Sequence, residues 1–208
     1  SIFLHFLLIF YKNRKGAQIL SKKKFIIARA GDLCIITASV ILYNVFGTGH
    51  LQTIFENAHL VFQGVNSHQL ELAAILVVIA AALKSAQFPT HGWLIEVVET
   101  PTPVSALLHA GLLNAGPFLA VRMAFLLTES HYAPFLLISI GGFTALFASI
   151  AYLTQPTIKV ALGYSSVAHM GFMLMICGFG LHAAVVLHLV AHSFYKAHAF
   201  LSSGSVID

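Results

Sequence analysis

Charged side chains are scarce in this sequence of 208 residues. Only 9% of the residues are Asp, Glu, Lys or Arg, 58% are hydrophobic, and the mean hydropathy is +0.87. A soluble domain has about a quarter charged residues, so this composition excludes an ordinary water-soluble surface. The composition instead predicts a membrane protein, in which each spanning helix needs about 20 apolar residues.

Cysteine is also rare. Cys34 and Cys177 both lie within apolar runs, and the sequence contains no Cys-x-x-Cys, Gly-x-Gly-x-x-Gly or His-Glu-x-x-His motif. Isolated cysteines in such runs are typical of small buried hydrophobic residues rather than of a disulfide or a metal pair. We therefore expect no redox centre, no other cofactor and no bound nucleotide.

The basic residues are distributed unevenly. Six of the eleven lysines and arginines lie between Lys12 and Lys24, in the run YKNRKGAQILSKKK. Beside apolar segments, a basic run marks a cytoplasmic loop under the positive-inside rule more often than a nucleic-acid site. We expect a cytoplasmic loop here and no nucleic-acid partner.

Apolar runs of suitable length predict the helices. The run at 1–11 is too short to cross a bilayer and lacks the basic leader of a signal peptide, so we expect a cut-off helix in an incomplete chain. About six complete spans are expected after it, at 25–46, 68–86, 103–127, 133–153, 160–180 and 182–204. A polar linker separates the first two. The predicted fold is an all-α, polytopic transmembrane helix bundle that forms a single domain over residues 1–208.

The segment 84–102, KSAQFPTHGWLIEVVETPT, does not resemble a span. It is bracketed by Pro89, Pro101 and Pro103. Because proline ends helices or begins them, only a short half-helix at 93–98 fits between these residues. We predict a discontinuous helix with a break between Gln87 and Thr102. Transporters use such breaks at ion sites, where protein or water covers the freed backbone groups.

Ionisable side chains within apolar spans each require an explanation, because a charge at the bilayer centre costs about 2.5–3.5 kcal/mol. They are Arg29, Asp32, Lys84, His109, Arg122, His169, His188, His192, Lys196 and His198. Lys84 directly precedes the predicted break, where we favour a proton-holding group over an interfacial lysine. The position of His109 fits a hydrogen-bonded core residue as well as a functional one. Arg29 and Asp32, at i and i+3, form either a structural ion pair or a functional one.

His188, His192 and Lys196 recur at i, i+4 and i+8 in AVVLHLVAHSFYKAHAFL, so they share one face of a helix. Two histidines at this spacing are able to bind a metal, but no carboxylate or cysteine accompanies them and a lysine follows. A row of titratable groups with water between them favours proton relay, with structural polar packing and a metal site as alternatives. We expect the row to face the protein interior rather than lipid.

Three segments match known sequence patterns. KSAQFPTHGWLIEVVETPTPVSALLHAG is similar to Lys-Ser-Ala-Gln-x-Pro followed by Gly-Pro-Thr-Pro-Val-Ser-Ala-Leu-x-His-Ala. LTQPTIKVALGYSSVAHMGFM is similar to Thr-Gln-x-Asp-x-Lys-Arg-x-Leu-Ala-Tyr-Ser, and HLVAHSFYKAHAFLSSGSVI to a His-x-x-x-His-x-x-x-Lys helix followed by Gly-Ser-Val-Ile. Together they resemble, over nearly the whole chain, the proton-conducting antiporter-like subunits of complex I and of Mrp antiporters.

This resemblance implies a proton relay through Lys84, His109, Lys159, His188, His192 and Lys196, with no catalytic residue and no metal. Lys84 matches the central proton-holding lysine on the family's broken helix, and Lys159 matches a lysine that begins a later helix. Arg29 and Asp32 match an Arg-x-x-Asp pair whose acid lies close to the channel. The family's partner glutamate and its later broken helix fall outside this chain, so the piece alone is not expected to form a complete path.

Departures from the pattern point to one branch of the family. Glu99 and Thr100 precede Pro-Thr-Pro where complex I subunits carry a glycine, Val160 replaces an arginine, and His198 replaces an apolar residue. These segments resemble the DabB branch more closely, in which the channel subunit partners DabA, a large carbonic-anhydrase-like protein, to accumulate inorganic carbon.

The resemblance implies a multi-pass subunit of the bacterial inner (plasma) membrane that moves protons or Na⁺ to energise its partner. Its expected partners are membrane lipid and the other subunits of a membrane complex, with a DabA-like protein as the candidate among them. One alternative is an L-type subunit of NADH-quinone oxidoreductase, part of a translocase. The others are an Mrp-type cation/proton antiporter subunit and a non-conducting scaffold.

Overall fold

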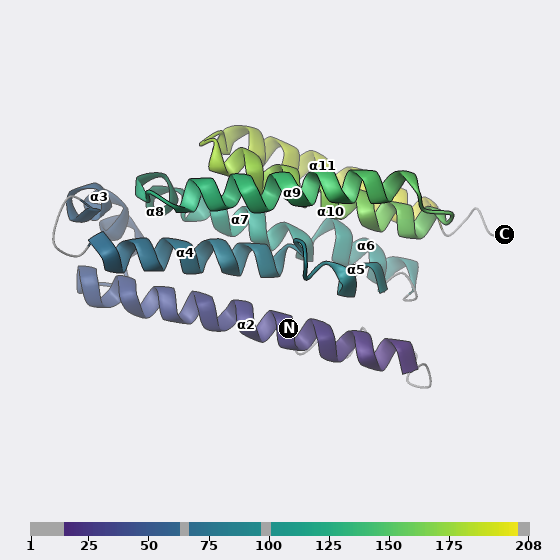
Figure 1. The fold of residues 1–208 in the computed structure, drawn as a ribbon, viewed down its shortest axis with the longest axis horizontal. Coiled ribbons are helices and arrows are strands. Elements are labelled where there is room, and N and C mark those ends of the chain that lie inside the picture. The colour runs from purple at the N-terminus through teal and green to yellow at the C-terminus, as the bar shows by residue number, and fades with distance from the viewer. Residues whose placement is uncertain (1–14, 63–66, 97–100, 204–208) are drawn as a thin grey trace.

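The structure is a computed structural model that describes residues 15–62, 67–96 and 101–203. Within these ranges every regular element is a helix, which confirms the predicted all-α class. The helices are α2 (Lys15–Phe46), α3 (Leu51–Phe62), α4 (Ser67–Lys84), α5 (Gly92–Glu96), α6 (Thr102–Ala110), η2 (Leu112–Asn114), α7 (Ala115–Arg122), α8 (Ala124–Glu129), α9 (Ala133–Leu153), α10 (Ile158–Gly178) and α11 (His182–Ser202). The long helices follow the long axis of the molecule, with α4 between α2 and α9 (Figure 1).

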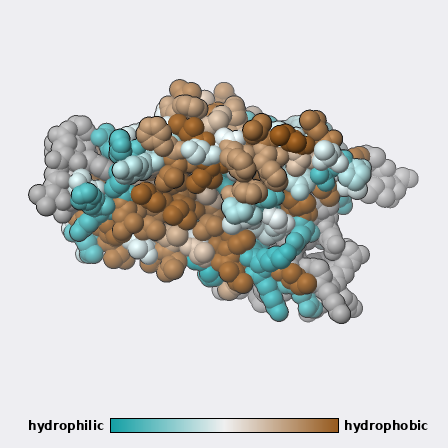
Figure 2. Space-filling model, in the orientation of Figure 1, coloured by the Kyte–Doolittle hydropathy of each residue, from teal (hydrophilic) through white to brown (hydrophobic). Residues whose placement is uncertain are grey.

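Five described helical segments are long and apolar enough to cross a membrane. They are Ser21–Phe46, Ser67–Lys84, Thr102–Arg122, Ala133–Leu153 and Ile158–Gly178. The 21 residues of α11 also have the length of a span, but four histidines and one lysine make this helix more polar, and its place as a sixth span stays a prediction. Figure 2 shows hydrophobic residues across the middle of one face and hydrophilic residues toward the two ends, as expected for a bundle that crosses a bilayer along its long axis.

Two of the predicted connections are wrong in local structure. The expected basic loop is helical from Lys15 to Lys24, where it forms the first turns of α2, because Lys, Gln and Ala are good helix formers. The expected polar linker contains α3, whose Ile54 and Ala58 are buried one turn apart on an apolar face. The cut-off helix expected at 1–11 lies outside the described residues.

The span predicted at 103–127 is interrupted. It is divided into α6, η2, α7 and α8, with Gly111 between α6 and η2. Pro117 has no N–H for the carbonyl of Leu113, four residues earlier, so the regular α-helical ladder is lost at this turn. A Cβ atom on Gly116 would collide with the Ala81 carbonyl oxygen and with the Ser85 side chain. The absence of a side chain at position 116 therefore lets α7 approach the end of α4 closely.

The hairpin of α9 and α10 is equally close. A Cβ atom on Gly171 would lie 2.7 Å from the Gly141 carbonyl oxygen and from the Ala145 nitrogen. Small residues at such a crossing allow two membrane helices to approach backbone to backbone. The observed bounds of α9 agree with the span predicted at 133–153.

The discontinuous helix is confirmed. The first half, α4, ends at Lys84, and the short helix α5 follows a turn. Ala86 has a φ of 53°, in the left-handed region, which takes the chain out of the helical path. Side chains and backbone satisfy the freed groups, since Phe88 N–H donates to Thr144 Oγ1 on α9 (3.2 Å) and Thr90 N–H donates to the Gln87 carbonyl (2.8 Å).

Candidate functional site

The helix break places Lys84 against α2, and their contact forms the first cluster of charged residues. Lys84 Nζ lies 2.6 Å from Asp32 Oδ1, and an Arg29 guanidinium nitrogen lies 2.5 Å from Asp32 Oδ2. Gly31, next to Asp32, leaves room for the Lys84 stem, because a Cβ atom there would already lie 3.6 Å from Lys84 Cγ. One carboxylate therefore holds two cations, one on each oxygen.

A cavity of about 280 Å³ adjoins this first cluster. Its lining includes Lys24, Asp32, Lys84 and Trp93. Lys24 Nζ lies 5.3 Å from the centroid of the Trp93 ring and within electrostatic range of Asp32 and Lys84. Three cations consequently surround one carboxylate, and the cluster carries net positive charge.

An ion pair holds the half-helix α5 over this cavity. Lys23 Nζ lies 2.6 Å from Glu96 Oε1, which links α2 to α5, although both side chains are about half exposed. Exposed pairs of this kind contribute about 0.2–1 kcal/mol to stability. The pair therefore helps to position α5 but adds little to the stability of the bundle.

A second cluster lies where α6 and α10 pack against α11. Lys196 is fully buried and its Nζ donates to the Leu162 carbonyl of α10 at 3.1 Å. His109 on α6 is also fully buried and its ring stacks on Phe200, with 4.2 Å between the ring centroids. His109, His192 and Lys196 lie within electrostatic range of one another.

The row on α11 faces the bundle to different degrees. His192 is 4% exposed and Lys196 is 0% exposed, whereas His188, one turn earlier, is partly buried. Both ring nitrogens of His192 and of His109 are buried and accept or donate no hydrogen bond to a protein group in the described part of the chain. Buried polar atoms are nearly always paired with protein or with water, so these four nitrogens are expected to have partners outside the described residues, either water or other protein groups.

His169 on α10 completes this second cluster. His169 Nδ1 and His188 Nε2 are 3.0 Å apart, a hydrogen bond whose donor depends on the tautomer. The His169 ring centroid also lies 5.3 Å from that of His192. Sequence reasoning recognised His169 as an ionisable residue in an apolar run but gave it no role. The signal was available, because an antiparallel hairpin that turns at Gly180 brings position 169 opposite positions 188 to 192.

Asn114 lies between the two clusters. It is 6% exposed, and its side-chain amide donates to Ser193 Oγ on α11 at 2.7 Å and to the Ala110 carbonyl at 2.8 Å. Ser193 directly follows His192, and Leu112, two residues before Asn114, lines the Lys84 cavity. The interrupted helix is thus bonded to α11 beside His192 through Asn114, and its Leu112 lines the cavity beside Lys84.

Lys159 stands apart. It lies in the first turn of α10, one turn before Leu162, whose carbonyl accepts the bond from Lys196. Within the described ranges, no hydrogen bond or ion pair joins Lys159 to the other five predicted relay residues. Across those same ranges, no group of three or more His, Cys, Asp or Glu side chains has the arrangement of a metal site.

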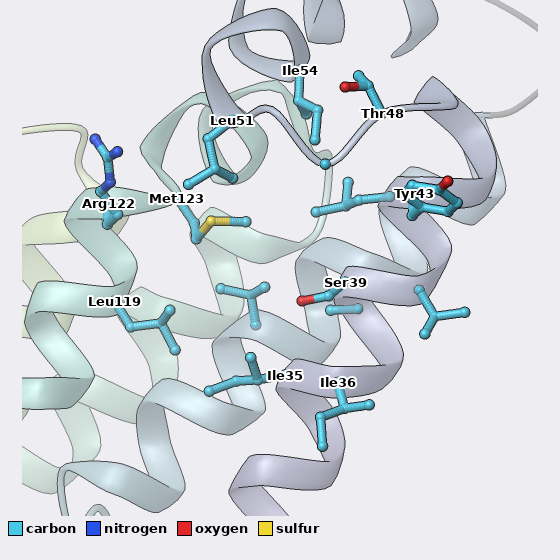
Figure 3. A pocket seen from close by; sticks show the side chains of 15 residues that line it. Ile35, Ile36, Ser39, Tyr43, Thr48, Leu51, Ile54, Leu119, Arg122 and Met123 are labelled. Carbon is cyan, nitrogen blue, oxygen red and sulfur yellow. The ribbon is translucent and has the colours of Figure 1, made fainter.

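A separate cavity of about 640 Å³ lies among α2, α4 and α7, around the linker that precedes α3 (Figure 3). Ile35, Ile36, Leu119 and Met123 contribute to its largely apolar lining, and Arg122 lies at its edge. None of the predicted relay residues contributes to this lining. The cavity therefore has no connection to either charged cluster.

These features define a multi-pass membrane protein with titratable clusters at and beside a broken helix. The whole chain, residues 1–208, matches the family model described as "NADH:quinone oxidoreductase/Mrp antiporter, TM". The chain belongs to this family, and the resemblance found in its sequence motifs is confirmed.

Individual relatives come from several branches of the family. The chain is 45% identical, over all of its 208 residues, to "Probable inorganic carbon transporter subunit DabB" of Hydrogenovibrio crunogenus, and covers 40% of that protein. It is 38% identical to "NAD(P)H-quinone oxidoreductase chain 5" of Synechocystis, with 98% of this chain and 30% of that protein covered. A chain in the structure of the Mrp complex from Dietzia superimposes with a TM-score of 0.87 at 27% identity, over 96% of this chain and 22% of that one. The chain thus spans 40% or less of the length of these relatives.

Proposed function

We propose that this chain is part of a cation-translocating membrane subunit that moves protons, or Na⁺, to energise a partner in inorganic-carbon uptake. Two facts support this proposal. The chain is 45% identical to a DabB protein, against 38% for a quinone oxidoreductase chain. It also holds two clusters of titratable residues, one partly exposed at the helix break and one largely buried among α6, α10 and α11.

The observation that carries the proposal is the shared carboxylate of Asp32. Because each of its oxygens binds one cation, a small movement of Asp32 strengthens the pair with Lys84 and weakens the pair with Arg29, or the reverse. A charge that arrives nearby, such as a proton in the adjoining cavity, biases this choice through the Coulomb interaction, which is strong in a medium of low dielectric constant. Lys84 is thereby a group whose counterion can be withdrawn, as proton release requires.

The second cluster supplies the onward path. Lys196, His109 and His192 are buried and lie within electrostatic range of one another, and the hydrogen bond from Asn114 to Ser193 joins the interrupted helix to α11 beside His192. We propose that Lys84, His109, His192 and Lys196 hold the proton in turn, with His188 extending the row. Among the described residues, neither these four residues nor Lys159 bond directly to one another, so water or a movement of the side chains has to link each step of the path.

A quinone oxidoreductase subunit is the second candidate function, supported by the 38% identity to chain 5 of Synechocystis. Growth separates the two candidates. The full-length gene, expressed with a neighbouring DabA-like gene in a strain that requires elevated CO₂, is expected to restore growth in air. Lys84→Ala at equal membrane abundance is expected to abolish that rescue, and Lys22→Ala, an exposed lysine on α2, to preserve it. Failure of the wild-type pair to restore growth contradicts the role in carbon uptake.

A further inference from the structure

The His169–His188 pair forms the inner wall of a cavity that the proposed relay through Lys84 does not use. This cavity has a volume of about 300 Å³ and lies among α9, α10 and α11. Its polar lining residues are Ser149, Tyr152, Ser165, His169 and His188. A cavity of this size has room for several water molecules, and its polar groups provide the partners that such water needs.

The polar residues of this cavity follow one another along the α9–α10 hairpin. Ser165 and His169 are four residues apart on α10, and Ser149 and Tyr152 are three apart on α9, so each pair shares a helix face. Tyr152 lies next to the last residue of α9, close to the 154–157 turn. Ser149 and Tyr152 are exposed, whereas Ser165, His169 and His188 are partly buried, so the cavity is a groove open at the surface that connects the end of the hairpin with the histidine pair. Figure 1 shows that this turn and the first residues of α2 lie at the same end of the bundle.

From this geometry we infer that His169 is an additional proton-relay residue, which receives protons through the Ser149–Tyr152–Ser165 cavity and passes them to His188. This inference rests on the proposed function and makes the cavity an entrance to the row on α11, while Lys84 controls the same coupled transport, so flux requires both Lys84 and His169. His188 then leads to His192, one turn further on the same helix, whose two ring nitrogens are buried and have no hydrogen-bond partner among the described residues.

The proposed transfer conserves protons and charge. A proton that arrives at His169 Nε2 forms an imidazolium, whose Nδ1 proton passes to His188 Nε2 along the 3.0 Å hydrogen bond. His169 is left neutral and His188 becomes the imidazolium, which releases its Nδ1 proton toward His192. Both rings end as the opposite tautomer, and ring rotation or a returning proton restores them.

A purely structural role predicts different behaviour. If the pair serves only to satisfy two ring nitrogens, any side chain able to bond to His188 replaces His169 without loss of transport. Asparagine is such a residue, because its amide donates and accepts hydrogen bonds but does not titrate. Alanine removes the group and leaves space in which free imidazole can bind.

The test uses the full-length protein with its partner subunits in proteoliposomes, and records proton flux at equal protein content. We expect His169→Asn and His169→Ala to reduce flux at least tenfold, and millimolar imidazole to restore part of it in His169→Ala only. Ser165→Ala removes one hydroxyl group from the polar lining of the cavity and is expected to reduce flux two- to fivefold. His198→Ala, at an exposed histidine on α11, is the matched control and is expected to be unchanged.

Wild-type flux in His169→Asn overturns the inference. If His169→Asn has wild-type flux and Lys84→Ala abolishes flux in the same preparations, the inference on His169 fails and the proposed function is retained. If Lys84→Ala and His169→Asn both transport normally, both proposals fail. Nitrogen NMR of histidine-labelled protein in lipid tests the pair independently of flux. We expect a coupling across the hydrogen bond between His169 and His188, which His169→Asn removes, and absence of that coupling in the wild type also overturns the inference.

Discussion

Gly116→Ala is expected to loosen the contact between α7 and the end of α4, and through it the Lys84 ion pair. The new Cβ would lie 2.6 Å from the Ser85 Cβ and Oγ atoms, and it would also collide with the Ala81 carbonyl oxygen. Ordinary van der Waals contact begins at 3.4 Å, so α7 has to move by roughly 0.8 Å to relieve the Ser85 contacts and somewhat further to relieve the closer contact with the Ala81 carbonyl oxygen. Overpacking of this kind typically costs about 1–3 kcal/mol.

The displacement acts on function because Ser85 directly follows Lys84. When Ser85 is pushed away from α7, the Lys84 backbone moves with it, and the 2.6 Å contact with Asp32 is expected to lengthen. At roughly 2–4 °C of melting temperature per kcal/mol for a chain of this size, we expect a decrease of about 2–12 °C. We also expect a several-fold loss of proton flux in the full-length protein at equal protein content.

The matched control is Gly92→Ala. No atom lies within 4 Å of a Cβ built on Gly92, which begins α5, so alanine there is expected to be neutral or slightly stabilising. Thermal unfolding of the purified full-length protein in detergent compares the two variants. Equal melting temperatures for Gly116→Ala and Gly92→Ala would show that α7 adapts without strain and would refute the reasoning.

Two further substitutions probe the break and its ion pair. Asp32→Asn removes the carboxylate that holds Lys84 and Arg29, so proton flux should be lost. The melting temperature should change little, because both ion pairs are partly exposed. Retained flux in proteoliposomes would contradict the role of the shared carboxylate. Thr144→Val removes the acceptor of the Phe88 N–H and should destabilise the protein by about 1–3 kcal/mol, the cost of a donor left without a partner. Thr144→Ser keeps the hydroxyl and should have wild-type stability in the same unfolding measurement. Equal stability of the wild type, Thr144→Val and Thr144→Ser would exclude a stabilising role for this hydrogen bond.

Local sequence signals were sufficient for the helix break and for most of the helices. Pro89 and the prolines at 101 and 103 act through backbone chemistry that requires no knowledge of the tertiary structure, and the structure has a break between the halves they bracket. The apolar run at 133–153 likewise corresponds to α9, because length and composition alone decide such a span.

The missed features depend on packing or on competing local preferences. Hydropathy placed the start of the first complete span at residue 25. Helix propensity extends α2 back to Lys15, across the basic residues. The interruption between α6 and α7 depends on Pro117 and Gly111, whose effect on a continuous apolar run was not visible from hydropathy. The role of His169 depends on which residues of α10 and α11 face each other, and the turn at Gly180 places position 169 near positions 188 to 192 without fixing which ring nitrogens meet.

Proton flux in proteoliposomes that contain the full-length protein and its partner subunits tests the central claim most directly. The comparison is between wild type, Lys84→Ala and Lys22→Ala, each normalised to the amount of reconstituted protein. The account predicts that Lys84→Ala abolishes flux while its abundance and assembly stay near the wild-type level, and that Lys22→Ala transports normally. Wild-type flux through Lys84→Ala at normal abundance would contradict the claim that Lys84 holds the transported proton.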